Sequence, residues 1–347
     1  MQNKMTRRKS LTAGVVSAGT LISSSNLTNA QYNSNKKTTL SFLTPWSPSV
    51  DLKQEITPGT KPVRLACPAY PLYYKENINI AEMVKRVRDN GYTAAIGGGH
   101  DWLLAPESSI IELKNALKRY DVVFAEIHIC ANNLHPDIYQ CRENHKLVIK
   151  AVESAERVGA RTVTVCLGSR SPDGTIYPHK DNWTPETWNA SVKAVKQILN
   201  DTAGMKVSLG MEAINLSPLN NPRAHLQLME EVGDDRCKVC LDPQNMLNIT
   251  TYFRTTELLN ECFDLLGENI LACHGKDVLL DPERMLPKFD WVVHGKGTMD
   301  YKTYLQRLSR MKYSRSLLLE FLSEDQYPEA KKYVEETAKK SGVTIYS

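Results

Sequence analysis

Residues 207–242, VSLGMEAINLSPLNNPRAHLQLMEEVGDDRCKVCLD, carry a strand pattern, a helix pattern and a second strand pattern in succession. The runs at 207–212 and 238–242 are apolar and too short for helices, which is typical of buried strands. The helical pattern at 222–231 separates them. A strand, a helix and a further strand in this order predict two parallel strands joined by a helical crossover.

The same alternation continues on both sides of this stretch. Further strand patterns occupy residues 63–67, 93–96, 122–129, 162–167, 270–274 and 316–321, and further helical patterns occupy residues 80–89, 109–119, 144–158, 183–200, 256–265, 301–310 and 328–339. Near the start of the helix at 183–200, Thr184 is followed by proline and glutamate, which predicts Thr184 as the N-cap. Eight strands and eight helices in strict alternation predict an α/β protein with a single-domain (β/α)8 TIM barrel.

An open doubly wound sheet is the alternative architecture. Such a sheet needs a glycine-rich turn after its first strand, where phosphate groups bind. Here Cys67 is followed by Pro-Ala-Tyr-Pro, and the glycines at 97–99 lack the spacing of that turn. The closed barrel is therefore favoured.

The N-terminus has the pattern of an export signal. Two arginines, Arg7 and Arg8, precede a mildly apolar stretch at residues 11–22, and Ala30 closes a run of small residues. This pattern predicts a twin-arginine-like signal at residues 1–30 and an exported, periplasmic protein; a disordered basic tail is the alternative. Residues 31–60 are expected to be a linker and residues 61–347 the barrel.

Charge argues against nucleic acid as a partner. The chain has a formal net charge of +4, and residues 1–30 hold four cationic side chains and no acidic one. Signal removal would bring the net charge to zero, which leaves no basic surface excess for nucleic acid. No apolar run of about 18 residues follows the signal, so membrane insertion of the mature chain is not expected.

Eight cysteines are present, including the pair Cys237 and Cys240. Three residues is an odd step along a strand, so these two side chains point to opposite faces of the sheet. Packing in the core is therefore a better interpretation than a redox or zinc motif.

Four polar residues each close an apolar strand pattern, namely Glu212, Asp242, His274 and Glu320. A polar side chain at the end of a buried strand is costly unless it is satisfied. In a barrel, the carboxyl ends of all strands meet at one face, where active sites lie. Three carboxylates and one imidazole suit a divalent ion such as Mn²⁺, Mg²⁺, Co²⁺ or Zn²⁺. For each residue alone, a salt bridge or helix cap is the simpler alternative.

These residues also carry a family resemblance. The motifs are Gly210-Met-Glu212, Leu241-Asp-Pro-Gln-Asn245, Cys273-His-Gly-Lys-Asp277, Gly295-Lys-Gly-Thr-Met-Asp300-Tyr301 and Leu319-Glu320. The chain from about residue 63 to residue 346 resembles the xylose isomerase-like barrels, which include sugar and sugar-phosphate isomerases and epimerases and apurinic endonucleases. The resemblance implies that Glu212, Asp242, His274 and Glu320 hold one divalent metal ion, commonly Mn²⁺. It also implies that Glu212 and Glu320 act as an acid/base pair.

Further residues are candidates for contact with a small carbohydrate substrate. Lys276 and Asn245 lie beside the expected ligands, and His100, His128 and His179 lie at or after the ends of earlier strands. Each histidine has the alternative of an exposed loop residue or a satisfied core residue. Trp102 and Trp183 are expected either to stack on a sugar face or to cap the barrel.

Proton transfer beside a sugar carbonyl passes through an enediolate, and a metal ion with two carboxylates suits that chemistry. The leading prediction is therefore a metal-dependent sugar isomerase or epimerase. A β-eliminating lyase acting on 3-keto-glycosides is the first alternative, followed by an apurinic endonuclease and a non-enzymatic sugar-binding barrel. Export favours a free or glycosidic sugar over a phosphorylated one. Assembly as a homo-oligomer stays open.

Overall fold

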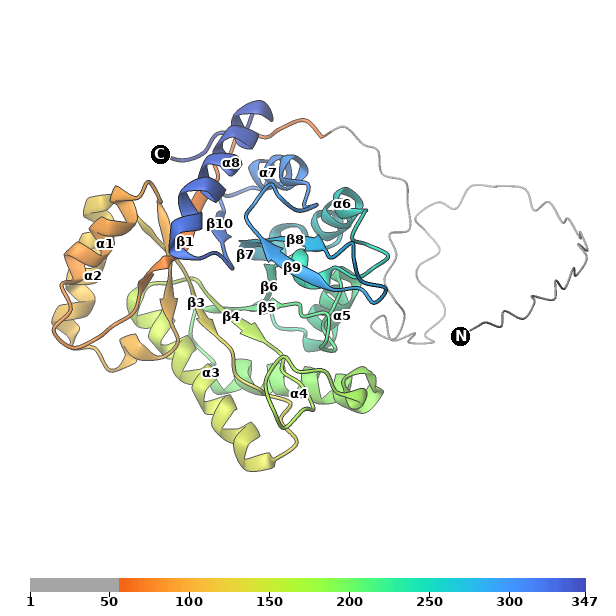
Figure 1. Cartoon of the computed structure of the whole chain (residues 1–347). Coiled ribbons are helices and arrows are strands. Elements are labelled where there is room, and N and C mark those ends of the chain that lie inside the picture. The colour runs from red at the N-terminus through yellow and green to blue at the C-terminus, as the bar shows by residue number, and fades with distance from the viewer. Residues whose placement is uncertain (1–55) are drawn as a thin grey trace, which may run out of the picture. The chain divides into compact units, whose positions relative to one another are not determined.

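The computed structural model describes residues 56–347, and the predicted signal and most of the predicted linker lie outside this part. Within it, eight parallel strands close into a barrel in the order β1-β10-β7-β6-β5-β4-β3-β2. Helices follow the strands and surround them (Figure 1). The predicted single-domain (β/α)8 barrel is confirmed.

The barrel strands are β1 (Arg64–Leu72), β2 (Ala94–Gly98), β3 (Val123–Ile129), β4 (Thr162–Cys166), β5 (Ser208–Glu212), β6 (Cys237–Leu241), β7 (Ile270–Gly275) and β10 (Ser316–Leu319). The helices are α1 (Ile80–Asp89), α2 (Glu107–Tyr120), α3 (Ile138–Val158), α4 (Pro185–Asp201), α5 (Pro222–Val232), α6 (Thr255–Leu266), α7 (Tyr301–Ser309) and α8 (Tyr327–Lys340). None of these helices is both long and apolar enough to cross a membrane.

Helix boundaries follow their caps. The Thr184 hydroxyl accepts the backbone N–H of Thr187 at the start of α4, as predicted. Helix α3 begins six residues earlier than predicted, because the Asp137 carboxylate accepts the N–H groups of Tyr139 and Gln140. The first residues of this helix, Ile138 and Tyr139, are exposed, so no apolar periodicity marks them in the sequence.

A two-stranded antiparallel hairpin interrupts the alternation after β7. It consists of β8 (Asp277–Leu280) and β9 (Phe289–Val292), in a register that pairs Val278 with Trp291. The sequence did not predict it, because each strand is only four residues long and neither is fully buried.

The Asp277 carboxylate fastens the base of this hairpin. It accepts the backbone N–H groups of Gly295, Gly297 and Met299 at 2.9, 3.1 and 3.2 Å. A Cβ on Gly297 would lie 2.1 Å from Oδ1 of Asp277, so this close approach requires glycine. Two of the motifs noted in the sequence, at 273–277 and 295–301, are thus one structural unit.

His294 adds a second fastening and is neutral at pH 7. Its Nε2 donates to the carbonyl of Gly275 at 2.8 Å, and its buried Nδ1 has no hydrogen-bond partner among the described residues. Burial lowers the pKa of His294 to about 4, although the bond to Gly275 opposes this shift. An unfolded histidine titrates near pH 6.5. Between pH 6.5 and about 4 the unfolded chain therefore binds more protons than the folded chain, and the free energy of unfolding decreases as the pH is lowered.

The variant His294→Gln is expected to reduce the loss of stability on acidification. Between pH 6.5 and about 4, His294 contributes at most about 1.4 kcal/mol per pH unit to the change in the free energy of unfolding with pH. Urea unfolding at pH 7 and pH 5 measures the effect, with His135→Gln, at a partly exposed position, as the control. An equal loss of stability in wild type and His294→Gln would contradict this origin of the pH dependence.

Candidate metal centre

The four predicted strand-end residues converge at the carboxyl end of the barrel. Glu212 ends β5, Asp242 follows β6, His274 lies in β7 and Glu320 follows β10. One ligand atom from each lies within 4.8 Å of the others, and all four side chains are buried. Because β10, β7, β6 and β5 are successive neighbours in the barrel, the four residues come from one continuous arc of its wall.

His274 is at the centre of this group. Its Nδ1 lies 3.3 Å from Oε1 of Glu212, 3.7 Å from Oδ2 of Asp242 and 3.5 Å from Oε2 of Glu320. Two ligands that each bind one ion at about 2.1 Å lie about 3.0–3.4 Å apart. The observed donor spacing is therefore close to that of a metal site.

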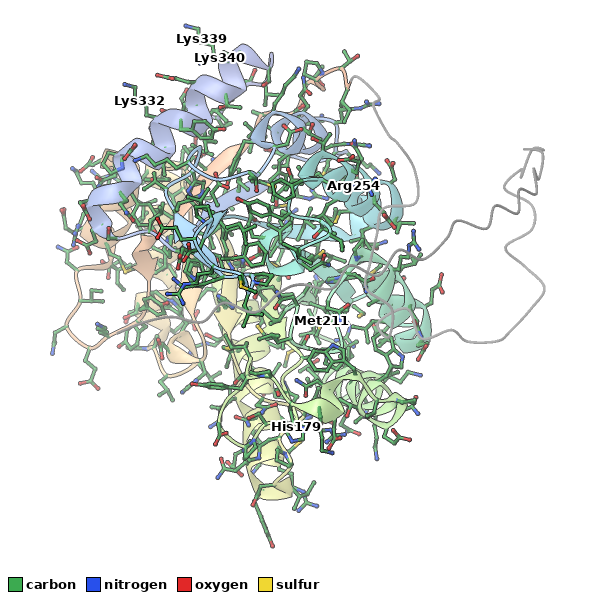
Figure 2. The ribbon with its side chains drawn as sticks, turned by 45° about the vertical axis from the view of Figure 1, so that its right-hand side comes forward. His179, Met211, Arg254, Lys332, Lys339 and Lys340 are labelled. Atoms are coloured by element: carbon green, nitrogen blue, oxygen red, sulfur yellow. The ribbon has the colours of Figure 1, made fainter. Side chains whose placement is uncertain are left out.

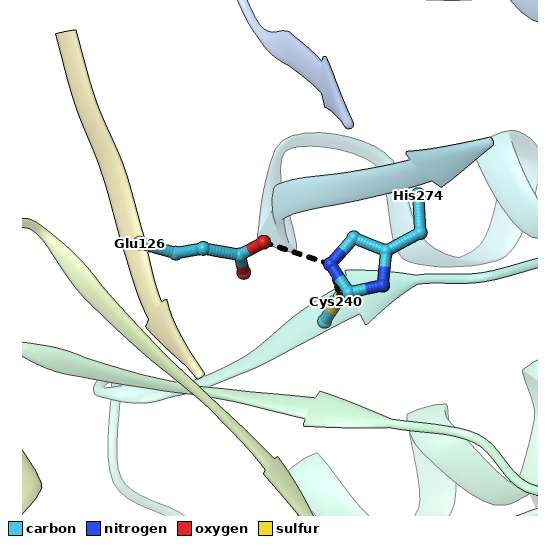
Figure 3. Close-up of side chains that lie close together, drawn as sticks. All are labelled: Glu126, Cys240 and His274. Atoms are coloured by element: carbon cyan, nitrogen blue, oxygen red, sulfur yellow. Dashed lines mark hydrogen bonds and ion pairs between the residues drawn. The ribbon is translucent and has the colours of Figure 1, made fainter. Parts of the chain in front are cut away.

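Glu126 orients this imidazole from the opposite side. Its Oε1 lies 2.7 Å from Nε2 of His274, and its Oε2 accepts a hydrogen bond from the hydroxyl of Thr164. Figure 3 shows the pairing of Glu126 with His274. A proton on Nε2, donated to Glu126, leaves the Nδ1 lone pair free to bind a metal ion. In the metal-free protein, burial raises the pKa of Glu126, but the charge of protonated His274 and its hydrogen bond outweigh burial and hold the pKa of Glu126 below its usual value.

Sequence reasoning missed Glu126. The signal was present, since Glu126 is an acidic residue in the middle of an apolar strand pattern rather than at its end. The side chain is 2% exposed. An acid in that position is costly without a partner, and the partner is supplied by a residue almost 150 positions later in the chain.

Lys276 faces the same three carboxylates. Its Nζ lies 2.5 Å from Oδ2 of Asp242, 3.1 Å from Oε2 of Glu320 and 3.7 Å from Oε1 of Glu212. Burial lowers the pKa of Lys276, but these carboxylates outweigh it and raise the pKa above its usual value. Lys276 is therefore a cation, and it lies beside the predicted ligands.

The charges and donors of the cluster fit a divalent ion. A metal ligand must be a neutral imidazole. With His274 neutral, the three carboxylates and the Lys276 ammonium leave two formal negative charges in a buried site, which one divalent cation would balance. Oδ2 of Asp242 pairs with Nζ of Lys276 at 2.5 Å and lies 3.7 Å from Nδ1 of His274. A metal ion bound at this oxygen would share it with the ammonium.

Neighbouring side chains hold the ligands in place. Nδ2 of Asn245 donates to Oε1 of Glu212 at 3.1 Å, and its backbone N–H donates to Oδ1 of Asp242 at 3.2 Å. The buried hydroxyl of Tyr304 is 3.1 Å from the carbonyl oxygens of both Leu241 and His274. The ends of β6 and β7 are thus fixed relative to each other.

His128, a predicted substrate-binding residue, also lies beside the cluster. Its Nε2 lies 3.5 Å from Oε2 of Glu212, and the Cys166 thiol donates to the same oxygen at 3.4 Å. Burial raises the pKa of Glu212, yet hydrogen bonds to His128 and His274 and the charge of Lys276 hold it well below its usual value. Glu212 is therefore ionised at neutral pH.

The other two predicted histidines lie elsewhere. His100 precedes the short helix η1 (Asp101–Leu103), and Nδ1 of His179 accepts the N–H of Asp181 in the loop after β4. No contact within residues 56–347 joins either to the cluster. Figure 2 shows His179 below Met211 of β5 and at the opposite end of the view from the labelled, exposed lysines of α8.

The two tryptophans do not form a sugar-stacking surface at the cluster. Trp102 is fully buried, and its Nε1 donates to the carbonyl of Leu72 at 2.6 Å. Trp183 is partly buried and packs against the same core. The stacking interpretation was wrong for Trp102, whose ring belongs to the interior.

Comparison with known proteins identifies related barrels. A family model described as "Xylose isomerase-like TIM barrel" matches residues 78–339. No curated protein matches the chain in sequence. Among solved structures, a xylose isomerase-like TIM barrel protein from Mycobacterium smegmatis in complex with magnesium is similar, with a TM-score of 0.59 and 14% identity over 81% of this chain and 98% of that one.

Two solved epimerases have the same fold. The 3-keto-D-glucoside 4-epimerase from E. coli has a TM-score of 0.57 and 17% identity, over 81% of this chain and 100% of that chain. A D-psicose 3-epimerase crystallised with D-fructose has a TM-score of 0.56 and 14% identity, over 80% of this chain and 96% of that chain. At these identities, the likeness establishes the fold.

The variant Glu126→Gln is expected to bind a divalent ion about 10- to 100-fold more weakly, because it loses the charge that fixes the imidazole. Calorimetric titration of the metal-free protein with Mn²⁺ measures this. Glu261→Gln is the control, since Glu261 is also a buried carboxylate but pairs with Arg223 at 2.7 Å. Unchanged affinity in Glu126→Gln would show that Glu126 does not support a metal ligand.

Proposed function

The chain belongs to the xylose isomerase-like TIM barrel family, and from this premise we propose that it is a metal-dependent sugar isomerase or epimerase. The observation that carries the proposal is the meeting of two glutamates at one imidazole. Glu212 and Glu320 come from β5 and β10, which are separated in the barrel by β6 and β7. Carboxylates from separate strands can address opposite faces of one substrate carbon.

The proposed reaction is proton transfer beside a sugar carbonyl, through an enediolate. Glu212 is held in its ionised form, as a general base must be at neutral pH. One glutamate removes the proton from carbon and the other returns it, to the opposite face in an epimerase or to the neighbouring carbon in an isomerase. A bound divalent ion would supply a Lewis acid that polarises the carbonyl.

Other side chains would orient the sugar. Lys276 brings its ammonium within 3.1 Å of Oε2 of Glu320, so it can donate a hydrogen bond to a substrate oxygen placed beside that carboxylate. Asn245 and His128 both contact Glu212 and can contact hydroxyl groups of the same substrate. Asp242 and His274 serve as metal ligands without a proton-transfer role.

We propose Mn²⁺ as the metal ion. A set of three carboxylates and one imidazole suits Mn²⁺ better than the thiolate-preferring metals. The M. smegmatis barrel is described as a complex with magnesium, which supports a divalent ion in this chain. Two similar structures are described as epimerases of sugars, which supports a carbohydrate substrate.

We also propose that the protein is exported to the periplasm. The paired arginines and the following apolar stretch of residues 1–30 support this location. Sugar phosphates are intracellular metabolites, so an exported enzyme would meet free or glycosidic sugars.

Solvent-deuterium uptake tests the proposed reaction. The Mn²⁺-loaded protein in D2O is expected to place deuterium beside the carbonyl of a sugar from a panel of free ketoses and 3-keto-glucosides, as measured by mass spectrometry. Glu212→Gln and Glu320→Gln are each expected to slow uptake by about 10²–10⁴-fold, whereas Glu261→Gln is not.

The products distinguish the alternatives. An epimer or isomer supports the proposal, whereas a free leaving sugar without an epimer would assign a β-eliminating lyase instead. Absence of uptake from every sugar of the panel by the metal-loaded wild type would contradict enediolate chemistry.

A further inference from the structure

Two half-exposed aromatic rings stand beside the carboxylate cluster. Trp291 lies in β9 and Phe321 follows Glu320 directly. Their ring centroids are 4.3 Å apart with the planes at 25°, so they are stacked. The ammonium of Lys276 lies 4.5 Å from the Phe321 centroid and 5.8 Å from that of Trp291. The pair therefore adjoins the cation that contacts all three carboxylates.

The backbone of Phe321 is strained. Its φ of +56° lies in the left-handed region, which a bulky side chain rarely adopts. The side chain is 54% exposed and that of Trp291 is 48% exposed, so the core does not require this geometry. A strained residue that presents a ring to solvent beside candidate ligands points to a binding role.

The hairpin that carries Trp291 is fixed in place. Asp277 binds three backbone N–H groups after the hairpin, and the N–H of Leu280 donates to the Tyr252 hydroxyl at 2.9 Å. The Tyr252 ring also packs on Phe289, with centroids 5.4 Å apart. The Trp291 ring is thus part of a preorganised surface, which loses little entropy when a ligand binds.

We propose that the open outer face of the Trp291–Phe321 stack is a platform for a pyranose ring, so that the substrate is a cyclic keto-glycoside, which carries its carbonyl on the ring, rather than an open-chain ketose. This inference rests on the proposed carbohydrate function and narrows its substrate class. A pyranose presents a continuous C–H face, which packs on flat aromatic rings. An open-chain sugar presents no such face and loses more conformational freedom on binding.

Direct binding separates the two substrate classes. The Mn²⁺-loaded protein is titrated with methyl β-D-glucopyranoside and with the acyclic six-carbon D-glucitol, by calorimetry. The wild type is expected to bind the pyranoside about tenfold more tightly than the polyol. Trp291→Ala is expected to abolish this preference and Trp291→Phe to keep most of it.

The control is Tyr313→Ala. Tyr313 is 56% exposed, close to the value for Phe321, but precedes β10 and so lies at the opposite end of the barrel. Its removal is expected to leave the affinity for both ligands unchanged. Equal loss in Tyr313→Ala and Trp291→Ala would overturn a specific platform.

Phe321→Gly separates a binding role from a folding role. Glycine relieves the strained φ while it removes the ring. We expect a thermal midpoint equal to or above that of the wild type, together with an affinity for the pyranoside about tenfold lower. A lower midpoint with unchanged affinity would assign Phe321 to folding and overturn the platform.

Failure of this inference differs from failure of the proposed reaction. If Trp291→Ala still binds the pyranoside more tightly than D-glucitol, and the wild type takes up deuterium, the platform is overturned and the proposed reaction stands. Loss of the preference in Trp291→Ala, without uptake from any sugar, supports the platform and overturns the reaction. A change of oligomeric state in Trp291→Ala without any change in sugar affinity would assign the rings to a protein interface and overturn the platform.

Discussion

Three buried carboxylates share one imidazole and one ammonium at the carboxyl end of the barrel. The surrounding residues hold these groups in place despite the imbalance of charge. A buried ion without compensation costs several kcal/mol, so Glu212, Asp242 and Glu320 need a further positive charge. Glu126 fixes the imidazole of His274 from behind, where it cannot itself bind the shared cation. Tyr304 holds the backbones of β6 and β7 together. Such support is what a metal site with defined geometry requires.

The barrel and the four converging residues were predictable because they depend on patterns that are local in sequence. Apolar runs of strand length, separated by helical patterns, decide the topology, and the position at a strand end decides which face a residue reaches. The partnership of Glu126 with His274 was not predictable in that way, since it depends on which side chains meet across the barrel. For His179, the sequence suggested a place at the site that the structure does not show. His179 follows a strand in sequence, but its loop carries it away from the cluster, because loop paths depend on packing rather than periodicity.

The β8–β9 hairpin supplies one of the two aromatic rings that adjoin the carboxylate cluster. The sequence suggested Trp102 and Trp183 as stacking residues because they lie near strand ends, but Trp102 is fully buried. The rings that stand beside the cluster come instead from the hairpin and from the residue after Glu320. The candidate metal ligands thus lie at strand ends that the fold dictates, whereas one of the two aromatic rings, Trp291, depends on the β8–β9 hairpin. This division agrees with the general separation of chemistry and specificity in such barrels.

Metal stoichiometry tests the central claim most directly. The metal-free protein is dialysed against Mn²⁺ and the bound ion is counted per chain for the wild type and for Asp242→Asn, a change that removes one ligand charge and keeps the side-chain size. One ion per wild-type chain, and much weaker or no binding in Asp242→Asn, is the result that the structure predicts. An absence of bound ion in the wild type, or equal binding in both proteins, would contradict the assignment of the four strand ends as a metal centre.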